Sequence, residues 1–304
     1  MSGCRLVTLK YLLIGCALLT CTPAPGSAQT FESVVIRAQG MAGAFVAVAD
    51  DAEATWWNPA GLASGSLFSG IVERGFARAP SDDSTLGVSF VVPSLGLSYY
   101  RLRSSVILPA GSGPQDQGVS GSRVATSVVD EIGASFGQSI GDHVVVASTL
   151  RLLWVDQFAG DIDIGAMLRL GVTRVGLVVK HLHEPELTAD GNPLVSFNRQ
   201  VRIGAAYVPH PGRTTLNAAI DADLTTTPTV FGNARHLAGG AELWFERRLG
   251  LRAGVSVNTV DQWRPSFSAG ASAALRSGFF LDAQLTRGED PVKEGWGLAA
   301  RVTF

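Results

Sequence analysis

The chain is poor in cysteine and in charged residues. Its three cysteines, Cys4, Cys16 and Cys21, all precede residue 29, so the remainder can form neither a disulfide framework nor a cysteine zinc site. Only 16% of the 304 residues are charged, whereas an average soluble domain has about 25%. The net charge of −2 and the isoelectric point near 6.2 argue against nucleic acid as a partner, because nucleic-acid-binding proteins present a basic face.

Long apolar runs are also missing. After residue 28 the sequence has no stretch of about 18 apolar residues, which excludes a transmembrane helix there. Residues 1–28 are predicted to be a secretory signal, because Arg5 and Lys10 precede a short apolar region and residues 26–28 are small enough for cleavage. A lipoprotein signal ending at Cys16 is the alternative, so the type of signal peptidase stays open. Without a membrane helix, an exported chain can cross a membrane only as a β-barrel.

Two-residue alternation of apolar and polar side chains is abundant, and it indicates strands with two different faces. In residues 251–258, for example, Leu, Ala and Val alternate with Arg, Gly, Ser and Asn. The pattern predicts about fourteen strands of roughly ten residues, the length that a tilted strand needs to cross a bilayer. The expected strands are 66–77, 84–92, 95–103, 124–139, 143–155, 161–170, 173–182, 198–208, 214–224, 236–246, 249–258, 264–275, 278–287 and 294–304.

The connections between the expected strands alternate in length. Short connections fall at 93–94, 141–142, 171, 209–212, 247–248 and 277–278, and longer ones near 104–122, 183–197, 225–235 and 288–293. Short periplasmic turns and longer outer loops are typical of an outer-membrane barrel. A soluble sandwich or lipocalin-like barrel is the alternative, and it would turn its apolar face inward. The sequence therefore predicts an all-β fold, a transmembrane barrel of about 14 antiparallel strands that is surrounded by outer-membrane lipid.

The polar face of the expected strands carries many charges. A basic side chain at the bilayer midplane costs roughly 2–4 kcal/mol, so these charges are expected to line a closed lumen in which opposite signs pair. Glycines on the strands are expected where another backbone comes close inside a tight lumen. The predicted lumen-lining residues are Arg151, Asp161, Asp163, Arg169, Arg202, Asp221, Asp223, Glu242, Arg252, Asp282 and Arg301.

The last expected strand ends on an aromatic residue. Apolar residues alternate from Trp296 to the terminal Phe304, a pattern similar to the terminal strand of bacterial outer-membrane proteins. Phe304 is therefore predicted to be an assembly signal that is read by the barrel-assembly machinery. Two further tryptophans, Trp154 and Trp263, lie at strand ends, where an aromatic girdle is expected.

Residues 29–63 do not alternate. A run of small apolar residues at 40–49 precedes Asp50, which is expected to cap a short helix, and Pro59 disfavours helix at Asn58. Residues 38–63 resemble the N-terminal region of the FadL/TodX family of outer-membrane transport proteins and of the related PorV/PorQ proteins. The residues that carry the resemblance are Asp50, Asp51, Trp57, Asn58, Pro59, Ala60 and Gly61.

The resemblance implies a fourteen-stranded barrel with a hatch, residues 29–63, inside its lumen. It also implies that the seven matching residues form the hatch or gate, with Asn58-Pro59-Ala60 at the family's Asn-Pro-Ala position. Residues 64–304 then form the barrel. The fatty-acid transporters of the family are longer and have large outer loops, so the modest loops of this chain favour the shorter PorV/PorQ-like branch.

Two patterns that suggest chemistry are better explained by the strands. The G-x-S-x-G spelling at 133–137 lies mid-strand, whereas a hydrolase elbow needs a strand-to-helix turn. His181 and His183, followed by glutamates at 184 and 186, could hold a metal because alternate residues share a strand face, but a polar loop at a strand end is the simpler interpretation. No catalytic residue, metal or cofactor is predicted, and the chain is not expected to be an enzyme.

Two functions are open at this point. The barrel could pass small hydrophobic molecules across the outer membrane through a hatch-gated lumen. Alternatively, it could be an anchor or shuttle component of a protein secretion system of the type IX kind, as the PorV resemblance implies. The expected partner is thus either a small hydrophobic ligand or a component of a secretion machine.

Overall fold

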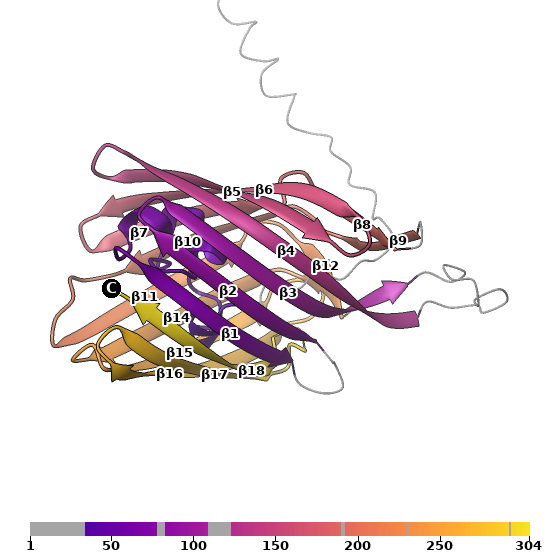
Figure 1. Cartoon of the computed structure of the whole chain (residues 1–304). Coiled ribbons are helices and arrows are strands. Elements are labelled where there is room, and N and C mark those ends of the chain that lie inside the picture. Colours follow the sequence, from indigo (N-terminus) through magenta and orange to yellow (C-terminus); the bar gives the residue numbers. More distant parts are fainter. Residues whose placement is uncertain (1–33, 78–82, 109–122, 190–191, 230, 292) are drawn as a thin grey trace, which may run out of the picture.

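The computed structural model describes residues 34–77, 83–108, 123–189, 192–229, 231–291 and 293–304. Fourteen antiparallel strands form a closed barrel in the order β1-β18-β17-β16-β15-β14-β11-β10-β7-β6-β5-β4-β3-β2 (Figure 1). The barrel closes where Ser69 of β1 pairs with Thr303 of β18. The predicted fold, an all-β barrel of 14 antiparallel strands, is confirmed. The predicted signal, residues 1–28, lies outside the described residues.

The barrel strands agree closely with the ranges expected from alternation. They are β1 (Ser69–Ala77), β2 (Ser84–Val92), β3 (Leu95–Leu108), β4 (Arg123–Ile140), β5 (Val144–Trp154), β6 (Phe158–Leu170), β7 (Thr173–Lys180), β10 (Gln200–Tyr207), β11 (Thr214–Asp223), β14 (His236–Phe245), β15 (Leu249–Asn258), β16 (Arg264–Arg276), β17 (Phe279–Gly288) and β18 (Gly295–Thr303).

The two ends of the barrel differ in their connections. Tight turns join strands at the end that holds the C-terminus, and Gly141 and Gly171 take the left-handed conformation there, with φ of 65° and 62°. The opposite end carries the longer connections (Figure 1). Two of these were expected to be loops, but each contains a two-stranded hairpin outside the barrel sheet: β8 (Glu186–Ala189) with β9 (Asn192–Ser196), and β12 (Thr227–Thr229) with β13 (Gly232–Ala234). Pairing within the connection satisfies backbone groups that a plain loop would leave to water.

Apolar side chains of the strands face outward and polar ones face inward. In β5, Leu150 and Leu152 are exposed, whereas Thr149 and Arg151 are buried. Other strands around the barrel also expose apolar side chains on their outer face: Leu97, Ile132, Ile164, Leu177, Ile220, Leu251, Phe267, Leu281 and Leu298. A soluble barrel has the opposite arrangement, so the outer face suits lipid. Among the described residues, none of the helices has the length and apolar character needed to cross a bilayer.

Residues 34–65, here called the N-terminal segment, lie inside the ring of strands (Figure 1). They include α1 (Ile36–Gly40), α2 (Ala54–Trp57) and the 3₁₀ helix η1 (Pro59–Ser64). Helix α1 contacts β15, β16 and β17 on one side of the barrel, and η1 contacts β4, β5 and β6 on another. Much of the buried apolar cluster comes from this segment, so the barrel interior is packed with it rather than empty.

The short helix α2 begins later than expected. Asp50 was predicted to cap it, but the helix starts at Ala54, and the carboxylate of Asp51 accepts the backbone N–H of Glu53 at 3.0 Å instead. Asp50 is drawn into ion pairs with Arg37 at 3.1 Å and Arg174 at 3.8 Å, which removes it from the helix end.

Candidate functional site

The Asn-Pro-Ala turn of the N-terminal segment is pinned through the side chain of Asn58. Asn58 is fully buried and has extended backbone, as expected for a residue that precedes proline. Its Oδ1 accepts the backbone N–H of Ala60 at 3.1 Å, which caps η1. Its Nδ2 donates to the carbonyl of Val46 at 2.9 Å and to that of Ala166 in β6 at 3.3 Å. One amide therefore joins the turn to the rest of the segment and to the barrel wall.

Pro59, Ala60 and Gly61 complete this turn and are buried. The N–H of Gly61 donates to the carbonyl of Asn58 at 2.9 Å. A side chain at Gly61 would collide with the carbonyl oxygen of Ala49, so the turn requires glycine there. Trp57 precedes the turn, is fully buried, and packs its ring edge against Phe45 with ring centroids 6.2 Å apart.

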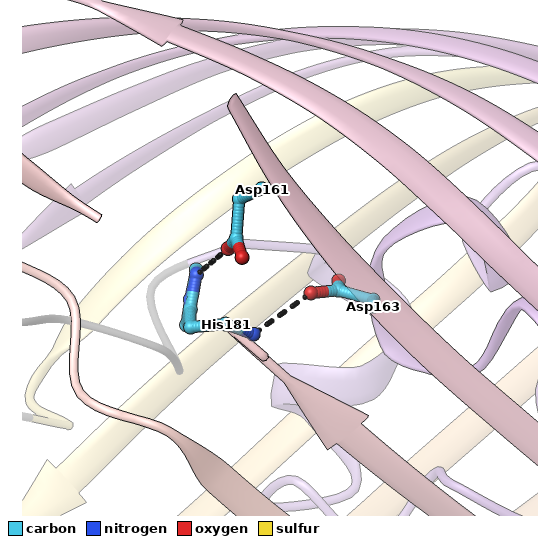
Figure 2. Close-up of side chains that lie close together, drawn as sticks. All are labelled: Asp161, Asp163 and His181. Atoms are coloured by element: carbon cyan, nitrogen blue, oxygen red, sulfur yellow. Dashed lines mark hydrogen bonds and ion pairs between the residues drawn. The ribbon is translucent and has the colours of Figure 1, made fainter. Parts of the chain in front are cut away.

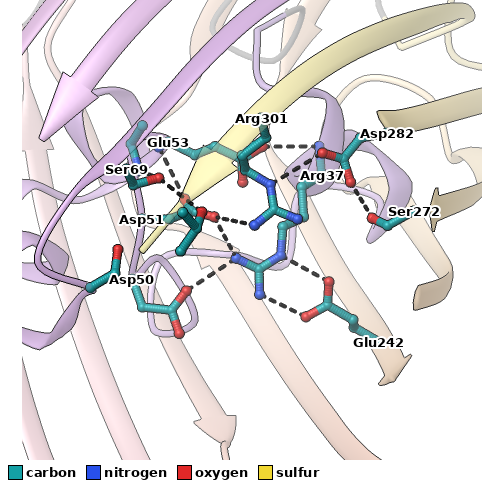
Figure 3. A network of polar contacts seen from close by, with 12 residues as sticks. Arg37, Asp50, Asp51, Glu53, Ser69, Glu242, Ser272, Asp282 and Arg301 are labelled. Atoms are coloured by element: carbon teal, nitrogen blue, oxygen red, sulfur yellow. Dashed lines mark hydrogen bonds and ion pairs between the residues drawn. The ribbon is translucent and has the colours of Figure 1, made fainter. Parts of the chain in front are cut away.

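Arg37 of α1 joins the N-terminal segment to the wall. Its guanidinium makes a bidentate pair with Glu242 of β14, at 2.8 and 2.7 Å, and also binds Asp51 at 3.0 Å and Asp50 at 3.1 Å (Figure 3). Burial opposes the charge on Arg37, but the nearby carboxylates hold its pKa well above the ordinary value. Bidentate pairing to a carboxylate is among the stronger polar contacts in proteins, so Arg37 is a principal attachment point.

The network extends along the wall behind Arg37. Arg252 donates to Glu242 at 2.6 Å and to Asp282 at 3.3 Å. Arg301 binds Asp282 at 3.1 Å and approaches Asp51 at 3.6 Å, and the hydroxyl of Ser272 also contacts Asp282 (Figure 3). The predicted lumen charges Glu242, Arg252, Asp282 and Arg301 are thus brought together, with Arg37 of the N-terminal segment among them.

A second attachment lies on β10 and β11. One carboxylate oxygen of Asp221 accepts the backbone N–H groups of Phe45 and Val46, at 2.7 and 2.8 Å. Arg202 pairs with Asp223 at 2.5 Å, and its guanidinium lies over the ring of Trp57 at 5.3 Å from the centroid. Three more of the predicted lumen residues therefore surround the segment.

A third cluster centres on Arg151, whose guanidinium binds Asp163 at 2.6 Å and also Glu131. His181 donates its backbone N–H to Asp163 at 3.0 Å, and its Nδ1 lies 2.6 Å from Asp161 (Figure 2). Lys180 is fully buried beside them, with its ammonium 3.7 Å from the ring centroid of Trp56. Arg151 also contacts the segment, because it donates to the carbonyl of Thr55 at 3.4 Å.

Asp161, Asp163 and His181 form the group that could hold a metal ion. One donor atom from each lies within 4.8 Å of the others, and all three are buried. Two carboxylates and an imidazole suit a divalent transition metal. However, Asp163 is engaged by Arg151, and Asp161 by His181 and by the N–H of His183, so the contacts describe an ion network.

The metal pattern noted in the sequence is not brought together. His181 takes a left-handed backbone with φ of 54° directly after β7, so the chain leaves the strand there. His183, Glu184 and Glu186 are exposed, and Glu184 lies 3.8 Å from Arg199 at the surface. The alternation argument fails here because the strand ends at Lys180.

Glycines on the wall lie where the N-terminal segment comes close. A Cβ atom on Gly176 of β7 would stand 2.6 Å from the carbonyl oxygen of Val46, and one on Gly254 of β15 would stand 2.5 Å from the carbonyl carbon of Met41. Such distances are below contact, so these positions admit no side chain without displacement of the segment.

The remaining residues singled out in the sequence lie apart from this site. Arg169 is half-buried near the tight-turn end of β6. Ser135 of the G-x-S-x-G spelling faces inward from β4 and shares a hydrogen bond of 2.8 Å with Thr149, in a strand and not at an elbow. Phe304 is 63% exposed and packs edge-on against Phe279, and its role as an assembly signal stays a prediction.

Several charged residues of these clusters were not among the predicted site residues, among them Arg37, Glu53, Glu73 and Glu131. Glu73 and Glu131 lie on the inward face of β1 and β4, so the alternation within the expected strands could have found them. Arg37 and Glu53 lie in the segment without alternation, where no periodic signal marks them.

No protein-family model and no curated sequence matches the chain. Solved structures do. The CymD monoaromatic hydrocarbon channel is 12% identical, with a TM-score of 0.62 over 91% of this chain and 99% of that one. The Ralstonia pickettii toluene transporter TbuX is 13% identical, with a TM-score of 0.62 over 90% and 99%. A Pseudomonas aeruginosa FadL homologue is 12% identical, with a TM-score of 0.54 over 92% and 99%. The chain has the fold of the FadL and TodX outer-membrane channels.

This fold, the closed barrel and the apolar outer face together place the chain in a bacterial outer membrane. The structurally similar proteins are channels and not enzymes, which agrees with the prediction of a non-enzymatic protein. The shorter PorV/PorQ-like branch, expected from the length of the loops, stays a prediction.

Proposed function

We propose that this barrel passes small hydrophobic molecules across the outer membrane and that the N-terminal segment, with the hatch or gate residues Asp50, Asp51 and Trp57 to Gly61, controls the passage. The observation that carries the proposal is the position of that segment: Phe45, Val46 and Trp57 are fully buried inside a closed wall. The names of CymD, a monoaromatic hydrocarbon channel, and TbuX, a toluene transporter, support a hydrophobic cargo.

The contacts that seat the N-terminal segment suit a part that moves. Beside the buried apolar cluster they include many hydrogen bonds and ion pairs, such as those of Arg37 with Glu242 and of Asp221 with two backbone N–H groups. Water can replace such partners when the segment shifts, so their net contribution to stability is modest. The run of small apolar residues at 44–49 would then face the passing molecule with a surface that has little polarity.

Conductance in planar bilayers tests the gate. Deletion of residues 34–65 should convert a closed barrel into an open, unselective pore, provided that heat-modifiable gel mobility shows the barrel to be folded. Arg37→Met is a milder variant that removes the pairs with Glu242, Asp50 and Asp51, and it should raise the frequency of open events. Conductance equal to that of the intact chain in both variants would refute gating by this segment.

A second candidate function is an anchor or shuttle component of a secretion system. The two hairpins β8–β9 and β12–β13 favour it, because they project from the end opposite the C-terminus and offer strand edges to a partner (Figure 1). Affinity purification from solubilised outer membranes separates the two functions. Recovery of a stoichiometric secretion component supports the anchor, whereas recovery of the barrel alone, together with uptake of a small hydrocarbon into liposomes, supports passage.

A further inference from the structure

Glu53 is a buried carboxyl group that lacks a full set of partners. Its side chain is fully buried in the N-terminal segment, directly before α2. One carboxyl oxygen accepts the backbone N–H of Arg37 at 3.4 Å, a long hydrogen bond, and Oε2 has no hydrogen-bond partner among the described residues. A buried charged oxygen without a partner costs free energy, so the protonation state of Glu53 affects how stably the segment packs.

Charged groups face Glu53 from three elements. The segment itself contributes Asp51 and Arg37, β1 contributes Glu73, and β18 contributes Arg301. Both guanidinium groups are already engaged: Arg37 binds Glu242, Asp50 and Asp51, and Arg301 binds Asp282 (Figure 3). Among the residues that the structure describes, neither arginine forms an ion pair with Glu53.

The surrounding network holds more carboxyl groups than guanidinium groups. Its buried carboxyls are Asp51, Glu53, Glu73, Glu242 and Asp282, and its buried guanidiniums are Arg37, Arg252 and Arg301. Glu73 is partly compensated, because its two oxygens accept the N–H groups of Val35 and Ile36, each at 3.0 Å. Glu53 has no comparable compensation, so it is the member best suited to carry a proton.

Electrostatics favour the same assignment. Burial raises the pKa of Glu53 well above its ordinary value, the neighbouring Asp51 carboxylate raises it further, and the opposing effects of Arg37 and Arg301 are smaller. The neutral acid is therefore the form compatible with the packed lumen.

We propose that Glu53 is a proton-binding site that controls how firmly the N-terminal segment is seated in the barrel. The neutral acid lies within the electrostatic influence of Asp51 and Glu73, and loss of its proton to alkaline medium adds a third negative charge to theirs and loosens the segment. The loosening would travel to the Asn-Pro-Ala turn, because α2 joins Glu53 directly to Asn58. Only the consequence for passage rests on the proposed function.

Hydrogen exchange followed by mass spectrometry tests the site on the full chain in liposomes. Exchange of peptides that cover residues 34–65 is compared between the wild type and Glu53→Gln from mildly acidic to alkaline pH, so that the intrinsic pH dependence cancels in the ratio. Between the ordinary pKa of a glutamate and the raised pKa of Glu53 in the barrel, the ratio of wild-type to variant exchange should rise about tenfold for each pH unit, and it should level off at higher pH. Glu53→Met, which also carries no proton, should behave like Glu53→Gln, and Glu289→Gln, an exposed control between β17 and β18, should behave like the wild type.

A ratio that stays constant across this pH range would overturn the inference. The conductance of the same samples separates it from the proposed function. A ratio that rises with pH while the conductance stays unchanged keeps the proton site and refutes the gate. A constant ratio refutes the proton site whatever the conductance does.

Discussion

Asn58 forms hydrogen bonds through both the oxygen and the nitrogen of its side-chain amide, so one substitution tests several contacts of the turn. Asn58→Ala removes three hydrogen bonds at once and leaves the buried carbonyl of Val46 and the N–H of Ala60 without these partners. Each buried group that loses its partner costs about 1–3 kcal/mol, so the variant should lower the free energy of unfolding by roughly that amount or more. Urea unfolding in phospholipid vesicles measures it.

The control for Asn58 is Gln138→Ala, which removes an exposed amide at the tight-turn end of β4. Surface substitutions of this kind change stability by less than about 0.5 kcal/mol. Equal unfolding midpoints for the two variants would mean that the turn is not held by the Asn58 amide.

Single residues also show which features of the lumen can be predicted from the sequence. Alternation assigns a side chain to a face, and it correctly assigns Arg151 and Glu242 to the inward face. It does not assign partners, because these depend on register and on the path of the N-terminal segment. The pair of Arg37 with Glu242 joins residues 205 positions apart, and no local pattern marks it.

At the scale of elements, β7 and the N-terminal segment approach one another at Gly176. Gly176→Val would place a side chain against the backbone of Val46, so the segment must shift or the strand must bend. Overpacking of this kind costs about 1–3 kcal/mol, and we expect a lower unfolding midpoint and faster proteolysis within residues 34–65. Urea unfolding in vesicles measures the midpoint, and limited proteolysis read by mass spectrometry measures the cleavage.

Gly160→Val in β6 is the matched control, because nothing lies within 4 Å of a Cβ atom there. Valine suits a strand, so this substitution should leave stability unchanged or slightly raise it. A Gly176→Val variant as stable as Gly160→Val would show that the N-terminal segment can be displaced at this contact without loss of stability.

Strand boundaries were predicted most accurately in the part of the barrel that faces lipid, where apolar and polar residues must alternate. The strand expected at 249–258 is found as β15 with the same bounds. At the long-connection end, β3 was expected to end at residue 103 but continues to Leu108, and the loops expected at 183–197 and 225–235 contain hairpins. Beyond the bilayer neither face needs to be apolar, so strands continue there without the alternation that reveals them.

At the scale of the whole molecule, the barrel is inverted relative to a soluble protein: leucines outside, arginines inside. Leu150→Arg tests this directly, because Leu150 is 51% exposed on the outer face in the middle of β5. An arginine on the lipid face near the midplane should destabilise the barrel by about 2–4 kcal/mol in phospholipid vesicles.

The depth dependence of that cost is the sharper test. Phe158 is 71% exposed at the start of β6, at the long-connection end, where an arginine can reach the interface. Phe158→Arg should therefore cost only about 0–1 kcal/mol. In a soluble barrel both substitutions would add a harmless surface charge, so equal and small losses of unfolding free energy for Leu150→Arg and Phe158→Arg would contradict the membrane placement, and with it the passage proposed for the lumen.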